Sequence, residues 1–212
     1  RGTDGRYYSS SDSASSGWDP AAVSAVSNAK LAYDYFSKVH DHDSYDGAGS
    51  RIDILVNSGD CNAGWYPDIR LLELGKGSAQ CDAKNFAISL DVMTHELTHG
   101  VVSSTSNLAY RNESGAIDES FSDFFGAMVD RDDWLIGDTL SLSGTYTRSM
   151  INPTSKPRQR AHFSDLYRGS EDKGGVHWNS GIQNRALYLI AEGLSSEGLG
   201  QSIGREKTEQ IA

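Results

Sequence analysis

The stretch that decides the fold is Ser89-Leu90-Asp91-Val92-Met93-Thr94-His95-Glu96-Leu97-Thr98-His99-Gly100-Val101-Val102. It contains no proline, it is rich in apolar residues, and a polar run from Ser103 to Asn107 follows it, which predicts a largely buried helix. Residues four apart share one face of a helix, so His95 and His99 can direct their ring nitrogens at one ion about 2 Å away, the ligand distance of zinc. Glu96 then lies beside the ion, where its carboxylate can take a proton from a metal-bound water.

A third ligand is expected from a second helix over residues 114–130, where apolar residues recur at helical spacing. A row of acidic residues on such a helix is usually a solvated face. Here Glu119 lies 20 residues beyond His99 (119 − 99 = 20), and a carboxylate on a neighbouring helix completes a three-ligand site with one open position. Asp123, one turn later, can hold the other nitrogen of a ligand histidine.

The composition fits a globular chain that does not bind polyanions. The 212 residues are 37% hydrophobic and carry a formal net charge of −10, with no cluster of Lys or Arg. We therefore expect neither nucleic acid nor a membrane as a partner. The first residues, Arg1 to Arg6, do not form a signal peptide, so any secretory segment has been removed or lies outside this sequence.

Cys61 and Cys81 are the two cysteines of the chain. They have neither a Cys-x-x-Cys spacing nor a neighbouring histidine, which argues against a second zinc site. A disulfide between them is the preferred interpretation and would indicate an oxidising compartment, with two buried free thiols as the alternative.

The remaining pattern predicts an α+β fold. Asp19 and Pro20 begin a helix that runs through Val23, Val26, Leu31, Tyr35 and Phe36 to about residue 39. The other segments are a flexible start over 1–17, a strand over 51–56, short strands and turns over 57–88, turns over 131–176, a helix over 182–191 and a helix-like end over 205–212. We expect an N-terminal helix and β part (1–88), a central metal-binding helix (89–103) and a mainly helical part (104–212).

Three ordered motifs give the chain a resemblance to the thermolysin-like zinc endopeptidases of the gluzincin type. They are His95-Glu96-Leu97-Thr98-His99, Asn112-Glu113-Ser114-Gly115-Ala116-Ile117-Asp118-Glu119-Ser120-Phe121-Ser122-Asp123 and Gly174-Gly175-Val176-His177-Trp178-Asn179-Ser180-Gly181. Weaker similarity extends from Ala32 to Lys207, which covers nearly the whole chain. The branch with a third histidine six residues after the second is excluded, because Thr105 occupies that position.

The resemblance implies a role for each matching residue. His95, His99 and Glu119 would be the zinc ligands, Glu96 the general base and later proton donor, and Asp123 the group that orients His95. Tyr110 and His177 would hydrogen-bond the oxyanion, with Asp172 supporting His177. Arg148 would hold the substrate backbone, and Asn62, Ala63 and Trp65 would belong to an edge strand that pairs with the peptide.

Two departures from the family pattern stand out. Asp118 replaces the usual Asn beside the third ligand, and Gly64 replaces a common aromatic residue of the edge segment. The family's calcium cluster is reduced to Asp91, Asp130, Asp133 and Asp138 with the carbonyl of Leu135, so one structural calcium is expected in place of two.

Together these features predict a secreted, extracellular, monomeric zinc endopeptidase. It would act on proteins or peptides, cleaving before bulky hydrophobic residues. The alternative is a non-catalytic zinc-containing module or an inactive fragment of such a protease. Because family members begin some tens of residues before Pro20 and continue with further helices after Lys207, we also expect the sequence to be a fragment, truncated at both ends.

Overall fold

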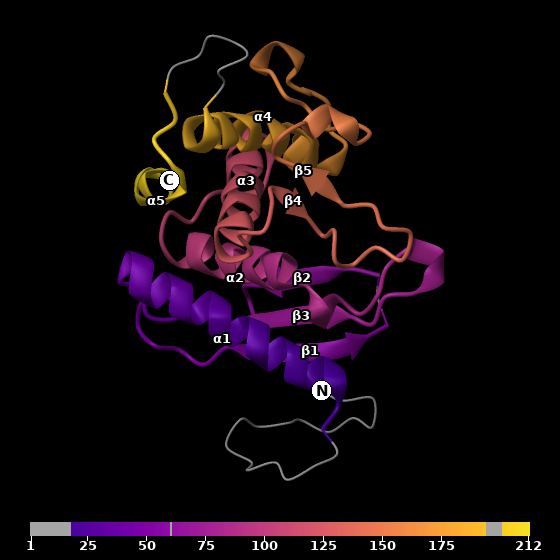
Figure 1. Ribbon diagram of the computed structural model, residues 1–212. Helices are drawn as coiled ribbons and strands as arrows, with labels where there is room; N and C mark the ends of the chain where they lie inside the picture. Colours follow the sequence, from indigo (N-terminus) through magenta and orange to yellow (C-terminus); the bar gives the residue numbers. More distant parts are fainter. Residues whose placement is uncertain (1–17, 60, 194–200) are drawn as a thin grey trace.

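The computed structural model describes residues 18–59, 61–193 and 201–212 (Figure 1). The flexible start predicted for residues 1–17 lies outside the described residues. The helices are α1 (Pro20–His40), α2 (Leu90–Ser104), α3 (Asn112–Val129), α4 (Asp172–Glu192) and α5 (Arg205–Ile211). The strands are β1 (Asp53–Ser58), β2 (Ala63–Tyr66), β3 (Leu71–Gly75), β4 (Leu135–Ile136) and β5 (Arg148–Ser149), and the 3-10 turns are η1 (Ala79–Cys81), η2 (Phe86–Ile88), η3 (Pro153–Ser155) and η4 (Phe163–Asp165).

The molecule divides into a sheet-containing half and a helical half, with α2 between them (Figure 1). In the first half, β3 is the middle strand of a three-stranded sheet in which it pairs parallel with β1 and antiparallel with β2. The second half is built on α3 and α4, and β4 pairs with β5 beside them. The mixed architecture confirms the predicted α+β class, and no helix in the described ranges has the length and apolar character needed to cross a membrane.

Helix α1 begins as the sequence predicts and buries two of its five predicted apolar residues, Tyr35 and Phe36. The Asp19 carboxylate accepts a hydrogen bond from the backbone N–H of Ala21 at 2.8 Å, and Pro20 occupies the first turn. Val23, Val26 and Leu31 are about half exposed, however. The buried face consists of Ala21, Ala22, Ala25, Ala29, Ala32, Tyr35 and Phe36. The small side chains let α1 lie close to its neighbours, and its large buried residues lie near its C-terminal end.

Helices α2 and α3 form the centre of the core. Met93 and Leu97 on α2 and Phe124 and Met128 on α3 are buried, at most 1% exposed. The two helices approach closely at Gly126, where a Cβ atom would lie 2.8 Å from the backbone oxygen of Asp91. This close approach brings the polar side of α3 up to the two histidines of α2.

Helix α4 begins earlier than the pattern predicts. Its first turn contains Lys173, Gly174 and Gly175 in the left-handed region, with φ of 51°, 94° and 81°, and regular helix follows from Val176. The sequence suggests a breaker at the two glycines and a helix only from residue 182. The left-handed turn joins directly onto the helix, and His177 therefore lies on the helix itself.

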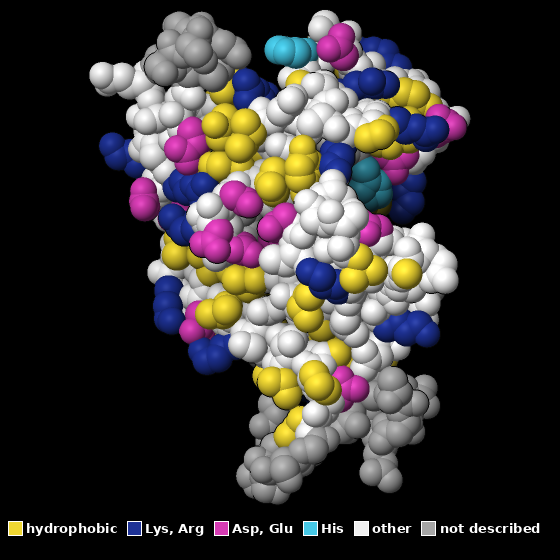
Figure 2. Space-filling model, turned by 45° about the vertical axis from the view of Figure 1, so that its right-hand side comes forward, with side chains coloured by type: hydrophobic (Ala, Val, Ile, Leu, Met, Phe, Trp, Pro, Cys, Tyr) yellow, Lys and Arg dark blue, Asp and Glu magenta, His cyan; other side chains and the backbone are white. Residues whose placement is uncertain are grey.

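Figure 2 shows one face of the molecule, on which acidic side chains gather where the two halves meet. The predicted disulfide is present and joins Cys61, just before β2, to Cys81 in η1, a separation of 20 residues. It ties the start of β2 to the segment that leads into α2.

Candidate metal centre

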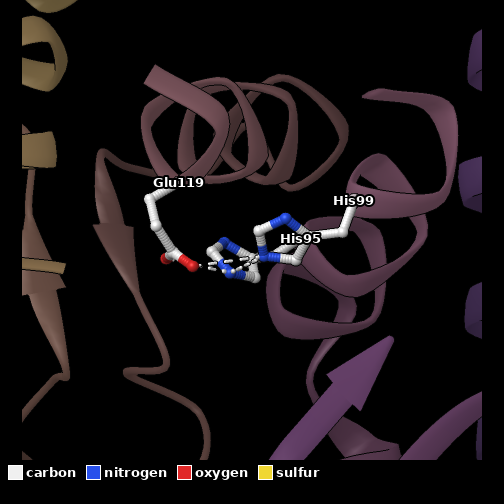
Figure 3. A group of neighbouring side chains, drawn as sticks. All are labelled: His95, His99 and Glu119. Atoms are coloured by element: carbon white, nitrogen blue, oxygen red, sulfur yellow. Dashed lines mark hydrogen bonds and ion pairs between the residues drawn. The ribbon is translucent and has the colours of Figure 1, made fainter. Parts of the chain in front are cut away.

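His95, His99 and Glu119 converge on one point (Figure 3). The Nε2 atoms of the two histidines lie 3.1 Å apart, and each lies 3.4–3.5 Å from an oxygen of Glu119. Zinc bonds of about 2.0–2.1 Å in a tetrahedron place ligand atoms about 3.3 Å apart. The spacing of these three side chains therefore fits a zinc ion, and it confirms that α3 brings Glu119 to the histidine pair.

One ligand atom of this group is buried without a hydrogen bond. Glu119 is fully buried, and its Oε2 has no hydrogen-bond partner among the described residues. A buried carboxylate oxygen costs free energy when it is left unpaired, and a cation removes that cost. The unpaired oxygen is thus an independent indication that the group fits a metal ion.

Each ligand histidine has a carboxylate next to Nδ1, the ring nitrogen that faces away from the metal position. Asp123 Oδ1 lies 2.9 Å from Nδ1 of His95, and Asp118 Oδ1 lies 2.8 Å from Nδ1 of His99. A carboxylate in this position accepts a hydrogen bond from Nδ1–H and keeps the proton on Nδ1, so the lone pair of Nε2 points toward the metal position. Asp118, an Asn in the usual family pattern, is thereby placed in direct contact with a ligand.

The electrostatics of the group favour positive charge at its centre. Burial alone would lower the pKa of His99, but Asp118 and Glu119 outweigh burial and raise that pKa well above its ordinary value. Burial would raise the pKa of Glu119, but His99, His95 and His177 outweigh it and hold that pKa well below its ordinary value. The surroundings therefore stabilise an anionic Glu119 facing a cation, which is the charge pattern of a metal site.

Asp123 is fixed by a buried polar network. Arg148 donates to it from Nε at 2.8 Å and from Nη2 at 2.6 Å, and Asn184 on α4 donates from Nδ2 at 2.8 Å. Asn184 in turn accepts a hydrogen bond from Ser120 at 2.7 Å. Burial would raise the pKa of Asp123, but the charges of Arg148 and His95 outweigh it and lower the pKa to about 2.

Tyr110 and His177 meet beside Glu119. The Tyr110 hydroxyl donates to Glu119 Oε1 and lies 3.3 Å from Nε2 of His177. Asp172 Oδ1 lies 2.6 Å from Nδ1 of His177, and Asp172 Oδ2 accepts from the backbone N–H of His177 at 2.9 Å. The side chain of His177 is 45% exposed, so its Nε2 can reach a bound molecule.

The left-handed turn before His177 requires its two glycines. A Cβ on Gly174 would lie 2.2 Å from the side-chain oxygen of Asn112, and a Cβ on Gly175 would lie 2.7 Å from the ring of Tyr167. Both glycines also have positive φ, which L side chains rarely adopt. The turn places the Asp172 carboxylate against the backbone N–H and the ring Nδ1 of His177.

A cleft of about 620 Å³ contains the metal group. Its wall includes Glu96, whose carboxylate makes no hydrogen bond within the described part of the chain, and Arg148, whose Nη1 makes none there either. Its apolar lining comes from separate elements, with Phe86, Val92, Ile136 and Leu140 among its members. The cleft thus combines a polar reaction centre with an apolar pocket.

The predicted substrate segment forms an edge of the sheet. Strand β2 pairs with β3 on one side and has no strand partner on the other in the described ranges. Asn62, Ala63 and Trp65 all line the cleft. Trp65 packs against Tyr45, with ring centroids 4.9 Å apart, and a Cβ on Gly100 would lie only 3.1 Å from the Trp65 ring. Gly100 therefore lets β2 lie directly on α2.

The residues of the expected calcium site lie near one another without forming a tight group. Across the described residues, the zinc group alone has three or more acidic, histidine or cysteine ligand atoms within 4.8 Å of one another. Asp91 Oδ2 accepts from the N–H of Gly137 at 2.5 Å, and Asp133 accepts from the N–H of Leu135 at 2.7 Å. Partial burial, followed by repulsion from Asp91, Asp132, Asp138 and Asp133, raises the pKa of Asp130 to about 6.

The sequence analysis did not assign a role to three residues of the site, Asn184, Ser120 and Lys173. Asn184 follows His177 by seven residues, two helical turns, and that spacing is the signal that could have placed it on the same face. Ser120 lies next to Glu119 and gave no separate signal. Lys173 also lines the cleft, and the sequence alone offers no reason to select it.

The chain belongs to the thermolysin metallopeptidase family. Residues 1–103 match the family model described as thermolysin metallopeptidase, catalytic domain, and residues 106–212 match the one described as thermolysin metallopeptidase, alpha-helical domain. The resemblance inferred from the three motifs is thereby confirmed.

Several known proteins are similar to this chain. Neutral protease B of Bacillus subtilis and bacillolysin of Brevibacillus brevis are each 45% identical to it over 199 residues, 91% of this chain. Thermolysin of Alicyclobacillus acidocaldarius is 40% identical over 205 residues, 92% of this chain. The chain spans 36–37% of the length of these relatives. A solved structure of the precursor of protealysin, a metalloproteinase from Serratia proteamaculans, superposes with a TM-score of 0.76 at 34% identity, covering 84% of this chain and 62% of that one.

Proposed function

We propose that the chain acts as a zinc-dependent endopeptidase. The observation that carries this proposal is the convergence of three ligand atoms, one of them otherwise unpaired, beside the carboxylate of Glu96. A bound zinc ion would supply Lewis-acid polarisation of a carbonyl and would lower the pKa of a water molecule. The ligand set is two histidines and one glutamate, which leaves a fourth position for such chemistry.

Proton transfer and stabilisation of the oxyanion are assigned to side chains of the chain itself. Glu96 lies on the helical turn of the two histidines and is free to accept a proton from the attacking water and later to pass it to the leaving nitrogen. His177 and Tyr110 are placed side by side to donate hydrogen bonds to the oxyanion. Asp172 holds the ring of His177 through its contact with Nδ1.

The cleft supports an extended peptide as the substrate. The open edge of β2 can pair with a peptide main chain, and Arg148 can donate to a substrate carbonyl from Nη1, because Nε and Nη2 are engaged by Asp123. The apolar pocket favours a bulky hydrophobic side chain next to the scissile bond. We therefore place cleavage before such residues.

The test uses the Glu96→Ala variant of the zinc-loaded chain. It should bind zinc at the same stoichiometry as the parent while casein turnover falls by about a thousandfold or more. Glu113→Ala, at an exposed position on α3, is the matched control and should retain turnover. Chelation should abolish cleavage by the parent, and added zinc should restore it.

A non-catalytic zinc module gives a different result. Zinc would then bind at full stoichiometry, while the parent would show no chelator-sensitive cleavage of casein or of a mixed peptide library. A parent that cleaves and a Glu96→Ala variant with equal turnover would remove Glu96 from the mechanism.

Calcium is proposed as a structural ion bound near Asp91, Asp130, Asp133, Leu135 and Asp138. The supporting observation is the raised pKa of Asp130, caused first by partial burial and then by repulsion from neighbouring aspartates, since a cation would relieve that repulsion. Saturating calcium should raise the melting temperature of the parent, and Asp138→Asn should reduce that increase. A melting temperature of the parent that does not change on addition of calcium would contradict the proposed calcium site.

The disulfide supports a place of action outside reducing compartments. We therefore propose a secreted, extracellular enzyme that acts as a monomer on proteins or peptides. Sedimentation of the purified chain tests the monomer directly. The redox state of the two cysteines in protein isolated without reductant tests the compartment.

A further inference from the structure

Two basic side chains line the cleft within the described part of the chain, and they differ in what holds them. Arg148 forms a two-pronged ion pair with the buried Asp123. Lys173 is exposed, forms no ion pair there, and places its ammonium 4.4 Å from the centre of the Tyr110 ring. A cation held over an aromatic face keeps its hydrogen-bond donors available for a second partner.

The backbone fixes the point from which Lys173 projects. Asp172 and Lys173 both have φ of 51°, and the Asp172 carboxylate contacts the backbone N–H and the Nδ1 of His177. Gly174 packs against Asn112 at the start of α3. Non-glycine residues in the left-handed region persist only where surrounding contacts enforce them. Lys173 is therefore part of the same turn that positions His177.

The charge of Lys173 opposes that of its surroundings. The cleft contains the carboxylates of Glu96, Asp118 and Glu119, and the whole chain has a formal net charge of −10. An acidic peptide would meet repulsion from these groups unless a cation lies near its own carboxylate. Lys173 lines the same cleft as Tyr110 and His177, which the proposed function assigns to the oxyanion.

We propose that Lys173 is a specificity-determining residue, one that pairs with a carboxylate of the peptide close to the scissile bond. The ligand chemistry is a carboxylate, supplied by a Glu or Asp side chain or by a free C-terminus. The inference rests on the proposed function, because it requires a peptide in the cleft. It goes further by giving this chain a preference for acidic groups beside the apolar residue.

The test measures peptide binding in a Glu96→Gln background, so that no turnover occurs. Labelled peptides carry one bulky apolar residue and a Glu at each of four flanking positions in turn, with Gln and Lys versions at the same positions. A further pair has a C-terminal acid or amide. Fluorescence anisotropy on the zinc-loaded chain then gives the ratio of the Kd of the Gln peptide to that of the Glu peptide.

Three variants define the expected pattern. Lys173→Gln should lower the ratio by about three- to tenfold at one or two positions, and Lys173→Arg, which keeps the charge, should retain it. Lys156→Gln is the matched control, because the Lys156 ammonium also lies over a tyrosine ring, 4.2 Å from the centre of Tyr146, and Lys156 does not line the cleft. The preference should also weaken as the salt concentration rises. If only the acid and amide pair responds, the ligand is the free C-terminus.

Other outcomes overturn the inference. Equal Gln-to-Glu and amide-to-acid Kd ratios in Lys173→Gln and its parent would do so. An equal loss of affinity for every peptide would also do so, because Lys173 would then only support the ring of Tyr110. Absence of binding by every peptide would also contradict it. Chelator-sensitive cleavage by the unmutated chain is followed separately: if cleavage is absent while the binding preference holds, the proposed function fails and this inference stands.

Discussion

Asp118 Oδ1 lies 2.8 Å from Nδ1 of His99, so the second ligand histidine is held by a carboxylate just as Asp123 holds the first. Both contacts are buried, with side-chain exposures of 8% for Asp118 and 0% for Asp123. A carboxylate attracts the Nδ1 proton more strongly than a neutral amide does, and this makes the ring a better electron donor at Nε2.

Asp118→Asn is therefore expected to weaken zinc binding by about tenfold, because a partner of a ligand histidine is neutralised while its shape is kept. Competition with a chromophoric chelator measures the affinity without reference to turnover. Asp165→Asn, at an exposed position in η4, serves as the control and should bind zinc like the parent. Equal affinity of all three proteins would show that the charge of Asp118 does not act on the metal.

The disulfide should contribute to stability through the unfolded chain. Replacing Cys61 and Cys81 together by serine should lower the free energy of unfolding by about 3 kcal/mol, the value expected for a loop of this length. Urea unfolding with and without reductant measures the effect. Reductant should destabilise the parent and leave the double variant unchanged. A parent that is insensitive to full reduction would contradict the prediction.

The alanine face of α1 should reject larger side chains. Ala32 is 0% exposed, so Ala32→Leu must displace its neighbours and should cost about 1–3 kcal/mol of unfolding free energy. Val26→Ala is the control, because Val26 is 54% exposed and its truncation should change stability by less than about 0.5 kcal/mol. Equal effects of the two substitutions would show that the helix does not pack through this face.

His40 should make stability depend on pH. Burial is the largest cause that lowers its pKa, and the charge of His42 lowers it further, while Glu209 opposes both. The unfolded chain then gains a proton at His40 near pH 6.5, before the folded chain does. The stability that neutral His40 contributes is present above that pH and is lost as the pH falls from 6.5 toward the lower folded pKa.

Urea unfolding at pH 7.5 and pH 5.5 tests this dependence. His40 Nε2 lies 3.1 Å from the hydroxyl of Tyr35, which donates to Glu209, so His40→Gln keeps an N–H donor without a titrating ring. The loss of stability between the two pH values should be smaller in the variant than in the parent. An identical loss would assign the effect to other groups.

The sequence alone predicted those features that depend on residues close together in the chain. The spacing of His95 and His99 is a property of one helix turn, and Glu119 and Asp123 repeat on the next helix with the same period. Asp19 with Pro20 fixes a helix start because both act on adjacent backbone groups. The family motifs added Tyr110, His177 and Asp172, and the structure places those three together beside Glu119.

Only the tertiary structure decided how these pieces meet. The sequence could not show that α1 packs through alanines, because packing depends on how closely a neighbouring helix can approach. Nor could it show that Asn184 reaches Asp123, that Arg148 commits two nitrogens to that carboxylate, or that Lys173 faces the ring of Tyr110. Those contacts join residues tens of positions apart, and their geometry is set by the crossing of α3 and α4. The sequence determined which side chains could perform the chemistry, and the packing of helices determined which of them share one cleft.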